Sequence, residues 1–464
     1  MLVVGGGPGG YAAAFAAADL GLGVTLVDEA PAPGGVCLYR GCIPSKALLH
    51  VAQVLNQARE AEQWGIRFGE PAIDLDALRA FKERVISQLT GGLSSLAKQR
   101  GVRYVQGRAR LLDAHRAEVT TAAGEREEIR FEHAIVATGS RPAALSDLAL
   151  DSPRVMDSTA ALELPEVPPS LLVIGGGYIG LELATVYSAL GSEVTVVEAT
   201  GGVLPGADRD LVRPLLASLK RRLKAIHLNT QVLSLTDAGE KIIARYRTEG
   251  GDEREEAFAR VLIAVGRRPN SQGLGLERTR VQVDARGFIK VDSQRRTAEP
   301  HIFAIGDVAG EPMLAHKATH EGRVAAEVIA GRRVAFEPQA IPAVVFTDPE
   351  VAWCGLTESA AQAAGREVKV VRFPWGASGR AATLGRTDGV TKLIVDPGTE
   401  QVLGVGITGP GAGELIAEGV LAVEMAAVAS DVHLSIHPHP TLSETIMEAA
   451  EAVYGSSTHL FRRR

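Results

Sequence analysis

The feature that most constrains the fold of this chain is a glycine-rich segment that occurs twice. Residues 3–28 read VVGGGPGGYAAAFAAADLGLGVTLVD, and residues 173–198 read VIGGGYIGLELATVYSALGSEVTVVE. Each copy has the pattern of an apolar strand, a glycine turn, a helix and a second strand that ends in an acidic residue. Both copies carry the same three glycines, which are Gly5, Gly7 and Gly10 in the first and Gly175, Gly177 and Gly180 in the second. The repeat therefore predicts two βαβ units.

This glycine spacing is typical of a turn that binds a dinucleotide. The first glycine permits the tight turn, the second lets the backbone approach a pyrophosphate, and the third lets the helix pack on the strand. Free N–H groups and the dipole of the helix N-terminus then favour the phosphates. The acids that end the second strands, Asp28 and Glu198, can accept hydrogen bonds from ribose hydroxyls. Two copies predict two sites, and the alternative is a pair of strand–helix turns with no ligand.

The second acid also indicates which nicotinamide cofactor fits. The carboxylate of Glu198 would repel a 2′-phosphate, and no arginine follows directly in Ala199-Thr200-Gly201. The second repeat is therefore predicted to bind NAD rather than NADP.

Length and composition are those of a large globular protein. The 464 residues predict two to four domains, and 46% hydrophobic with 22% charged residues allow an extensive core. A net charge of −6 gives no reason to expect nucleic acid or an anionic membrane as a partner. Residues 1–18 are uncharged, but they lack the basic start of a signal peptide and are rich in glycine. We expect neither a signal peptide nor a membrane span, and a cytoplasmic location.

Only three cysteines occur, Cys37, Cys42 and Cys354. In a reducing compartment, a close pair is more often catalytic or metal-binding than structural. In one regular helix the Cα atoms of Cys37 and Cys42 would lie roughly 8–9 Å apart, too far for a disulfide. Cys37 is therefore expected in an irregular segment. Cys354, alone in sequence, is expected to be a buried structural thiol.

The second cysteine of the pair precedes a helix start. Pro44 suits a first helical turn, which places Cys42 near the N-terminus, where the dipole stabilises a thiolate. This pattern predicts a redox pair. The alternatives are two buried free thiols or half of a zinc site, which would need two further ligands although no second cysteine pair exists. No metal is expected.

The segment GGVCLYRGCIPSKALLH, residues 34–50, resembles the active-site segment of the pyridine nucleotide–disulfide oxidoreductases, and the dihydrolipoamide dehydrogenase subfamily in particular. The resemblance covers essentially the whole chain. It implies that the first repeat binds FAD, that Cys37 exchanges with substrate and that Cys42 faces the flavin as a thiolate. Lys46 resembles the family's lysine near the flavin, paired with Glu182. The alternative for Lys46 is a solvated cation on a helix, and the alternative for Glu182 is an acid that is simply favoured in the first turn of a helix.

Four other segments resemble cofactor-binding parts of this family. They read AIVATGSRP, VLIAVGRRPN, HIFAIGDV and LAHKATHEG and begin at residues 134, 261, 301 and 314. The cofactor-binding residues that they imply are Thr138, Gly139, Gly266, Asp307 and Ala315. The alternative for Asp307 is a turn aspartate after a strand. Tyr178 could cover the nicotinamide pocket, or it could be an ordinary packing residue of its helix.

The sequence IHPHPTLSE, residues 436–444, resembles the family's catalytic base segment. His439 is the predicted base that forms the substrate thiolate, and Glu444 is predicted to orient its ring. The competing interpretation is structural, because Thr441-Leu442-Ser443-Glu444 also matches a capping box. His437 is the less favoured base. The resemblance implies a cis peptide bond before Pro440.

The predicted fold is α/β, with two Rossmann-like dinucleotide-binding domains and a C-terminal α+β dimerisation domain. We place the first part of the FAD-binding domain at residues 1–141 and the NAD-binding domain at 142–266. A central segment, 267–337, completes the FAD region, and the dimerisation domain spans 338–464. Since only four residues precede Gly5, the first strand is expected to be short or to begin upstream of this sequence.

The resemblance implies a homodimer in which each base serves the disulfide of the other subunit. The implied reaction is oxidation of protein-bound dihydrolipoamide to lipoamide with reduction of NAD⁺, within a 2-oxo acid dehydrogenase complex. The implied partners are the lipoyl domain and the subunit-binding domain of a dihydrolipoyl acyltransferase. The alternative is a related NAD(P)H-dependent disulfide reductase similar to glutathione reductase.

Overall fold

The first glycine-rich segment lies at the centre of a seven-stranded sheet in the computed structural model, which describes residues 1–145, 148 and 150–460. The strand order is β17-β6-β1-β2-β3-β4-β5, with the first five strands parallel and the last two antiparallel. The strands are β1 (Leu2–Val4), β2 (Thr25–Asp28), β3 (Arg103–Leu111), β4 (Arg116–Thr121), β5 (Arg126–Arg130), β6 (Ala134–Val136) and β17 (Ile302–Ala304). β1, β6 and β17 are wholly apolar and buried, as expected for strands covered on both faces.

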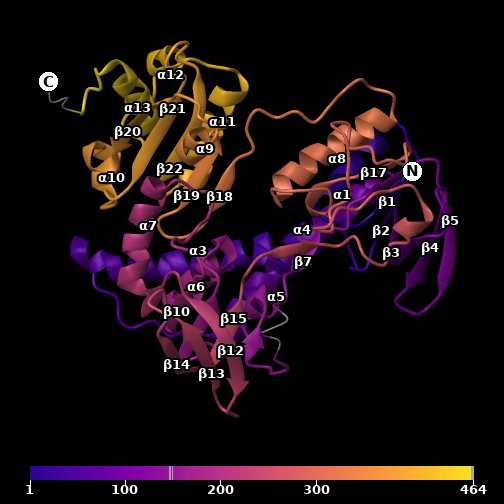
Figure 1. Cartoon of the computed structure of the whole chain (residues 1–464), viewed down its shortest axis with the longest axis horizontal. Helices are drawn as coiled ribbons and strands as arrows, with labels where there is room; N and C mark the ends of the chain where they lie inside the picture. Colours follow the sequence, from indigo (N-terminus) through magenta and orange to yellow (C-terminus); the bar gives the residue numbers. More distant parts are fainter. Residues whose placement is uncertain (146–147, 149, 461–464) are drawn as a thin grey trace.

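Two helices pack side by side against this sheet, α1 (Pro8–Asp19) and α8 (Ala315–Ile329) (Figure 1). Small residues allow the close approach, because a Cβ atom at Gly322 of α8 would lie 2.5 Å from the carbonyl oxygen of Gly9 in α1. The helices α2 (Gly35–Arg40), α3 (Cys42–Glu60) and α4 (Leu75–Gln99) complete this part of the chain. A sequence segment near residue 300 thus completes a sheet that begins at residue 2.

The second glycine-rich segment forms a separate five-stranded parallel sheet of order β11-β10-β9-β15-β8. Its strands are β8 (Val155–Met156), β9 (Ser170–Ile174), β10 (Glu193–Val197), β11 (Ala225–His227) and β15 (Arg260–Ile263). Its helices are α5 (Ser158–Leu162), α6 (Tyr178–Leu190) and α7 (Arg209–Arg222). An antiparallel meander of β12 (Gln231–Asp237), β13 (Ile242–Arg247) and β14 (Glu253–Phe258) is inserted before β15.

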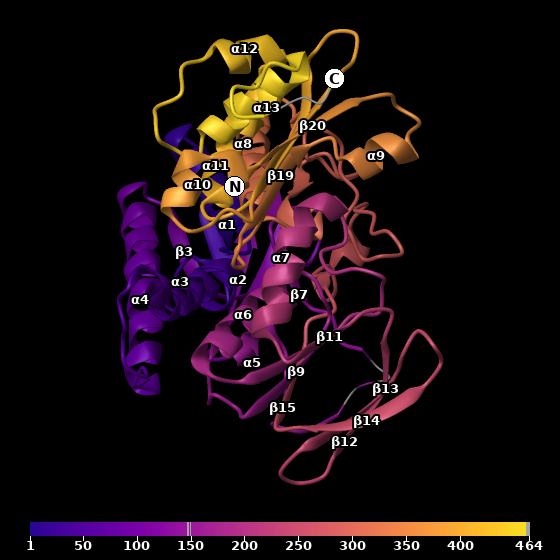
Figure 2. The same cartoon turned by 90° about the vertical axis from the view of Figure 1, so that its left-hand side faces the viewer.

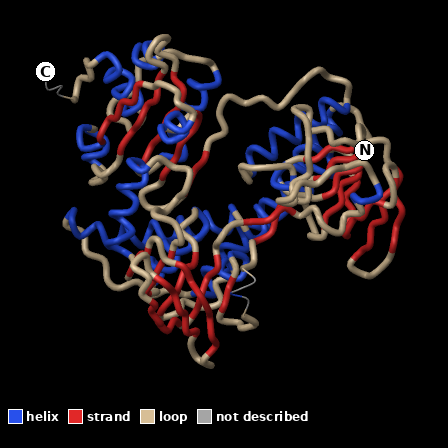
Figure 3. The backbone as a smooth tube through the Cα atoms, viewed as in Figure 1, coloured by secondary structure: helices blue, strands red, loops and turns tan. Residues whose placement is uncertain are grey.

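A two-stranded antiparallel ribbon joins these two bodies. It pairs β7 (Ser140–Pro142), where the chain leaves the first sheet, with β16 (Arg267–Pro269), where it returns from the second. Figure 3 shows the strands gathered in three groups, one for each body and one for the C-terminal region.

The C-terminal region is an antiparallel five-stranded sheet of order β18-β19-β22-β21-β20 with helices. Its elements are β18 (Ala343–Val345), β19 (Val351–Gly355), α9 (Glu358–Ala363), β20 (Lys369–Pro374), α10 (Gly379–Thr383), β21 (Val390–Val395), β22 (Val402–Thr408), α11 (Ala412–Glu424), α12 (Ala429–Leu434) and α13 (Glu444–Tyr454). Figures 1 and 2 place α12 and α13 at the opposite end of the molecule from the β12–β14 meander. Cys354 is 1% exposed in this core, and burial raises the pKa of its thiol to about 12.

A buried ionic cluster ties α7 to the C-terminal sheet. Lys392 of β21 is 1% exposed, and its Nζ lies 2.7 Å from Asp208, 3.0 Å from Asp210 and 2.7 Å from Glu358. The three carboxylates lie close enough together to hold a metal ion. The Lys392 ammonium group already provides the positive charge that the three carboxylates need. The cluster is therefore a salt-bridge network between two regions of the chain.

Among the described residues, no helix combines the length and the apolar character needed to cross a membrane.

Candidate active site

The first glycine turn has the geometry of a phosphate-binding turn. Gly5 has φ +105°, and a Cβ atom there would lie 2.2 Å from the carbonyl oxygen of Ala137. A Cβ atom at Gly10 would lie 1.8 Å from the carbonyl oxygen of Gly5. The fold itself therefore requires the first and third glycines. At Gly7, by contrast, the nearest atom to an added Cβ is the Cα of Gly35 at 3.9 Å, which leaves room for a ligand phosphate.

The second turn repeats this geometry. A Cβ atom added to Gly175 would lie 2.4 Å from the carbonyl oxygen of Ala264, and one added to Gly180 would lie 2.2 Å from the carbonyl oxygen of Gly175. A Cβ atom added to Gly177 would face open space. Gly7 and Gly177 are the N-caps of α1 and α6, and neither helix has a side-chain cap. The first N–H groups of both helices therefore remain available to phosphate oxygens. Both turns fit a dinucleotide pyrophosphate.

The two strand-end acids bind back to their own turns. Asp28 accepts the Gly6 N–H at 2.5 Å and the Ala30 N–H at 2.8 Å. Glu198 likewise accepts the Gly176 N–H at 2.6 Å, and its other oxygen accepts the Thr200 N–H and hydroxyl. These bonds fix each carboxylate beside its turn, and a carboxylate retains further lone pairs for ribose hydroxyls.

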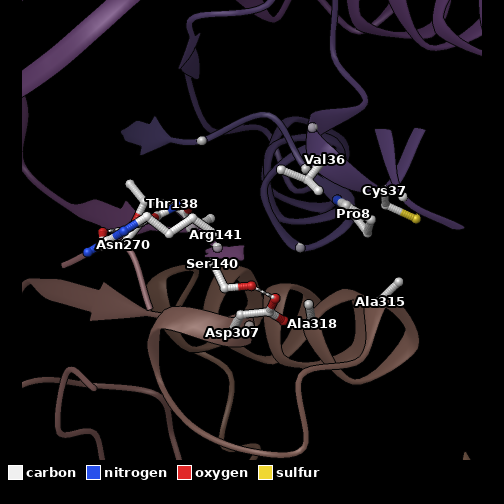
Figure 4. A pocket seen from close by; sticks show the side chains of 18 of the residues that line it. Pro8, Val36, Cys37, Thr138, Ser140, Arg141, Asn270, Asp307, Ala315 and Ala318 are labelled. Carbon is white, nitrogen blue, oxygen red and sulfur yellow. Dashed lines mark hydrogen bonds between the residues drawn. The ribbon is translucent and has the colours of Figure 1, made fainter. Parts of the chain in front are cut away.

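A cleft of about 710 Å³ runs from the first glycine turn to the cysteine pair (Figure 4), a volume in the range of cofactor sites. The predicted site residues that line it are Gly5, Gly7, Asp28, Cys37, Cys42, Lys46, Thr138, Gly139, Glu182, Asp307 and Ala315. Tyr178 also lines it, at the N-terminus of α6. Gly10 lies behind the turn, and Gly266 (φ +119°) lies between β15 and β16, away from the cleft. Gly175, Gly177, Gly180 and Glu198 belong to the second turn and do not line this cleft.

Asp307 and Thr138 are held by residues that the sequence analysis did not single out. Ser140 donates its hydroxyl to Asp307 and accepts the Nε–H of Arg267 at 2.7 Å, as the cleft view of Figure 4 shows for the first of these bonds. Thr138 donates to the carbonyl oxygen of Asn270 at 2.7 Å, and the Asn270 amide donates to the Thr138 carbonyl at 3.0 Å. These polar contacts join the segment where the chain leaves the first body to the segment where it leaves the second.

The cysteine pair spans the junction of two helices. α2 ends at Arg40, Gly41 takes φ −146° and ψ −116°, and α3 begins at Cys42. A Cβ atom at Gly41 would lie 2.8 Å from the carbonyl oxygen of Val36 and 3.2 Å from the Cα of Cys37. The expectation that Cys37 lies in an irregular segment was wrong, because it lies within α2. The break at Gly41 folds the chain back, so the spacing within one continuous helix does not apply.

The two thiols, both free in this structure, differ strongly in acidity. A hydrogen bond from Cys37, aided by the charge of Lys46, lowers the pKa of Cys42 to about 7 although desolvation opposes this. The pKa of Cys37 is raised because it donates this hydrogen bond and because it is buried. In the reduced pair, Cys42 is therefore the thiolate and Cys37 the thiol that donates to it.

Lys46 connects the cysteine helix to the other two bodies. Its Nζ lies 2.8 and 3.0 Å from the two carboxylate oxygens of Glu182 in α6, whose side chain is 4% exposed. Glu182 also accepts the N–H of Phe346 at 3.0 Å, and the Lys46 ammonium group lies 4.5 Å from the centre of the Phe346 ring. The pairing of Lys46 with Glu182 that the resemblance implies is present in the structure.

The His439 ring bonds to Glu444. His439 Nδ1 lies 2.9 Å from Glu444 Oε1, and the other oxygen, Oε2, accepts the Thr441 N–H at 2.7 Å. Glu444 thus bonds both the ring and the Thr441 backbone, but Thr441 is not the cap of this helix, because α13 begins at Glu444 with Ser443 as its N-cap. The Thr441 hydroxyl bonds to the Pro438 carbonyl and the Ser443 hydroxyl. Burial would raise the pKa of Glu444, but the bonds from Thr441 and His439 outweigh it and lower that pKa. The peptide bond before Pro440 is cis.

The second histidine of this segment is fully engaged. His437 Nε2 lies 2.7 Å from Glu418 and Nδ1 lies 2.8 Å from the carbonyl oxygen of Ser435, and its side chain is 7% exposed. The His439 side chain is 74% exposed. Neither histidine lines the cleft that holds the cysteines. Within one chain, the structure therefore keeps the His439–Glu444 pair apart from Cys37 and Cys42.

Comparison with known proteins places the chain in a family. The model described as pyridine nucleotide-disulphide oxidoreductase matches residues 1–322, and the model of that family's dimerisation domain matches residues 341–450. Proteins named dihydrolipoyl dehydrogenase from Vibrio cholerae and Haemophilus influenzae are each 48% identical over 460 residues, which is 99% of this chain and 96% of theirs.

Solved structures agree with this relationship. LpdA from Mycobacterium tuberculosis matches with a TM-score of 0.90 and 29% identity over 97% of this chain and 99% of its own. The HOCl-induced flavoprotein disulfide reductase RclA from Escherichia coli matches with a TM-score of 0.86 and 28% identity over 97% of this chain and 99% of its own. The predicted α/β fold with two dinucleotide-binding regions and a dimerisation domain is thereby confirmed. The chain belongs to the pyridine nucleotide-disulphide oxidoreductase family.

Proposed function

We propose that this chain is a dihydrolipoyl dehydrogenase, which oxidises protein-bound dihydrolipoamide to lipoamide and reduces NAD⁺. The relatives that carry this name align over 99% of the chain. The observation that carries the chemistry is the asymmetric pair of Cys37 and Cys42 that lines the cleft. A thiolate of lowered pKa is the better leaving group, so the pair suits an exchange in which the substrate attacks Cys37 and Cys42 leaves.

The two glycine turns and their acids fit the two cofactors. Gly5, Gly7 and Asp28, together with Thr138, Gly139, Asp307 and Ala315, would hold FAD in the cleft. Gly175, Gly177, Gly180 and Glu198 would hold NAD, with Tyr178 at the lip of the cleft between the two. FAD, when bound, supplies the two-electron relay between the cysteine pair and NAD⁺. The charge of Lys46 stabilises the Cys42 thiolate, while Glu182, which holds Lys46 in place, partly opposes this effect.

The exchange itself is carried by the cysteines and a histidine. His439 accepts the proton of one substrate thiol, and the resulting thiolate attacks Sγ of Cys37 in the oxidised enzyme. The Cys37–Cys42 bond breaks, and Cys42 leaves as a thiolate, which its low pKa favours. His439 passes the first proton to Cys37 as that thiolate leaves the mixed disulfide, and it accepts the proton of the second substrate thiol, whose sulfur closes the lipoamide disulfide. Two electrons then remain in the cysteine pair, with Cys42 as thiolate, Cys37 as thiol and the second proton on His439.

The base is proposed to act across a homodimer. His439 is exposed and lies outside the cleft of its own chain, and the region that carries it matches the family's dimerisation domain. In this arrangement His439 of one subunit serves Cys37 of the other, and each site is built from two chains. We further propose that the dimer is cytoplasmic and serves a 2-oxo acid dehydrogenase complex. Its partners there would be the lipoyl and subunit-binding domains of a dihydrolipoyl acyltransferase.

Anaerobic titration of the FAD-loaded protein with dihydrolipoamide tests the proposal. We expect a long-wavelength absorbance band beside the flavin bands, followed by NADH formation when NAD⁺ is added. Flavin that stays oxidised with dihydrolipoamide but is reduced by NADPH would exclude lipoamide as the substrate. It would favour a reductase similar to glutathione reductase. The variant Cys37→Ser is the control, since it should keep flavin and dimer and lose turnover with dihydrolipoamide.

A further inference from the structure

A second cavity lies at the opposite end of α3 from Cys42. It has a volume of about 240 Å³, far above the roughly 10–15 Å³ that one water needs, and it lies between α3, α6 and α7, partly open to solvent. The residues that line it are Asn56, Arg59, Glu60, Thr185, Ser188, Ala189, Leu219, Arg222 and Leu223. None of these residues lines the cleft that holds the cysteines, so the cavity is a separate feature of the fold.

The floor of the cavity carries an amide with no partner. Asn56 is 7% exposed and lines the cavity, yet its side chain makes no hydrogen bond to any residue that the structure describes. The polar atoms of this amide are accessible from the cavity, so a ligand or water molecule held there can satisfy them. Asn56 offers both donors and an acceptor to that molecule.

The charged groups around the cavity define what fits beside this amide. Arg59 uses one nitrogen, Nη2, to donate to the carbonyl oxygen of Ala189 at 2.9 Å, and its Nε–H and Nη1 donors have no partner among the described residues. Arg222 is committed to Glu60 at 2.8 Å and to Asp348 at 2.6 Å. Arg59 is an exposed residue, and these donors make it the cation available to an anion in the cavity, where a guanidinium group matches a planar carboxylate.

The remaining acid limits the ligand to one negative charge. Glu60 bonds Arg222 through Oε1, while its Oε2 atom has no hydrogen-bond partner in the described part of the chain. Oε2 would repel a second carboxylate and would accept a hydrogen bond from a hydroxyl group. The hydroxyls of Thr185 and Ser188 already donate to backbone carbonyls, at 2.8 and 3.0 Å, and add only polar walls.

We propose that this cavity is a binding site for a small hydroxy monocarboxylate, whose carboxylate bonds to Arg59 and whose hydroxyl group bonds to Asn56 and Glu60. The site is independent of the dinucleotide cleft and of the proposed reaction. Its occupant would contact α3, the helix that begins at Cys42, and α6, the helix that carries Glu182.

Calorimetric titration of the FAD-loaded dimer with lactate tests the site. We expect saturable binding with one lactate per chain. Binding of the neutral analogue lactamide, or of the dicarboxylate malonate, should be about tenfold weaker or more, the usual effect of losing one charge-assisted hydrogen bond. Equal binding of lactamide would exclude an anion site, and equal binding of malonate would exclude the role of Glu60.

Three variants locate the bound acid. Asn56→Leu and Arg59→Gln should each weaken lactate binding about tenfold or more. Arg67→Gln removes an exposed arginine that pairs with Glu62 at the surface, and it should leave binding unchanged. Should both cavity variants bind lactate as the wild type does, the acid sits elsewhere and the proposal is wrong. Absence of saturable binding to the wild type overturns it as well. The Arg59→Gln arm keeps the test valid if Asn56→Leu fails to fold.

Discussion

His439 and Glu444 are joined by a bond of 2.9 Å between Nδ1 and Oε1, while the other oxygen of Glu444 holds the Thr441 N–H. The carboxylate is thus fixed by the backbone before it meets the imidazole. Because Glu444 occupies Nδ1, Nε2 is the ring nitrogen left for the proposed role as a base. The side-chain exposure of 74% for His439 and 21% for Glu444 agrees with an accessible ring held by a partly buried carboxylate.

The first prediction concerns this pair. Glu444→Gln keeps an oxygen that can accept the Thr441 N–H, but it removes the charge that supports the imidazolium. We expect the protein to fold with nearly unchanged stability and lipoamide turnover to fall about 10²-fold or more. Glu451→Gln is a matched control on the same helix, because Glu451 lies near His433 instead. Full turnover in Glu444→Gln would show that Glu444 has only a structural role.

Much of this site follows from local sequence, for a physical reason. Gly10 and Gly180 are required because a Cβ atom would meet the carbonyl oxygen of Gly5 or Gly175, about one helical turn earlier in the same segment. The His439–Glu444 bond spans only five residues, and the resemblance of residues 436–444 to the family's base segment predicts it. Such local constraints leave a pattern in the sequence that can be recognised without the tertiary structure.

Other parts of the site depend on contacts that the sequence does not show. Arg267 and Ser140 are 127 positions apart and bond only because β7 and β16 pair into one ribbon. Cys37 lies in α2, and Gly41 breaks the chain between α2 and α3 with a backbone conformation that spacing does not reveal. The sequence likewise posed capping and catalysis as alternatives for Glu444, whereas the two oxygens of its carboxylate bond the His439 ring and the Thr441 N–H at the same time.

A second prediction concerns the acidity of Cys42 in the reduced pair. The hydrogen bond from Cys37 is the largest cause that lowers the pKa of Cys42 to about 7, from an ordinary value of 9.0. Cys37→Ala removes that donor, so the pKa of Cys42 should rise toward its ordinary value. Titration of thiolate absorbance in the ultraviolet measures it. The reduced wild type should lose its thiolate signal as the pH falls through about 7, and Cys37→Ala should lose it at a higher pH.

The control for this titration is Cys354→Ala. The thiol of Cys354 is buried and its pKa is raised to about 12, so its removal should leave the curve between pH 6 and 9, roughly the range around the Cys42 pKa, unchanged. An unaltered midpoint in Cys37→Ala would show that the Cys37 hydrogen bond does not set the acidity of Cys42.

A third prediction separates the two dinucleotide turns. Gly7 and Gly177 have φ −72° and −75°, which alanine adopts without strain, and a Cβ atom meets no protein atom closer than 3.9 Å at either position. We therefore expect Gly7→Ala to fold but to retain FAD about tenfold less tightly or worse, because the methyl group occupies the space of the phosphate. Gly177→Ala should keep its FAD and show a raised KM for NAD⁺. Fluorescence of released flavin and steady-state kinetics measure the two effects.

The clash at Gly10 provides the contrast for that prediction. A Cβ atom there would lie 1.8 Å from the carbonyl oxygen of Gly5, so Gly10→Ala should fail to fold or lose stability. If Gly7→Ala holds FAD as firmly as the wild type, the cleft does not place a phosphate beside Gly7.

The last prediction concerns the ionic cluster that ties α7 to the C-terminal sheet. Lys392→Met would leave Asp208, Asp210 and Glu358 without the buried ammonium group between them. Removing one partner of a buried ion pair costs about 3–5 kcal/mol, so urea unfolding at neutral pH should show a loss of that order. The control is Lys220→Met, at an exposed position of α7, which should change the free energy of unfolding by about 0.5 kcal/mol or less.

The same cluster gives stability a defined pH dependence. Burial would raise the pKa of Asp208, but hydrogen bonds from Lys392 and from the N–H groups of Glu358 and Ser359 outweigh it and lower the pKa to about 2. The lowered pKa means that this carboxylate stabilises the fold fully above its ordinary value of 3.8, and that the contribution is lost as the pH falls toward 2. The free energy of unfolding should therefore fall more steeply between those values in the wild type than in Asp208→Asn. Equal slopes would show that the cluster does not couple protonation of Asp208 to the attachment of α7.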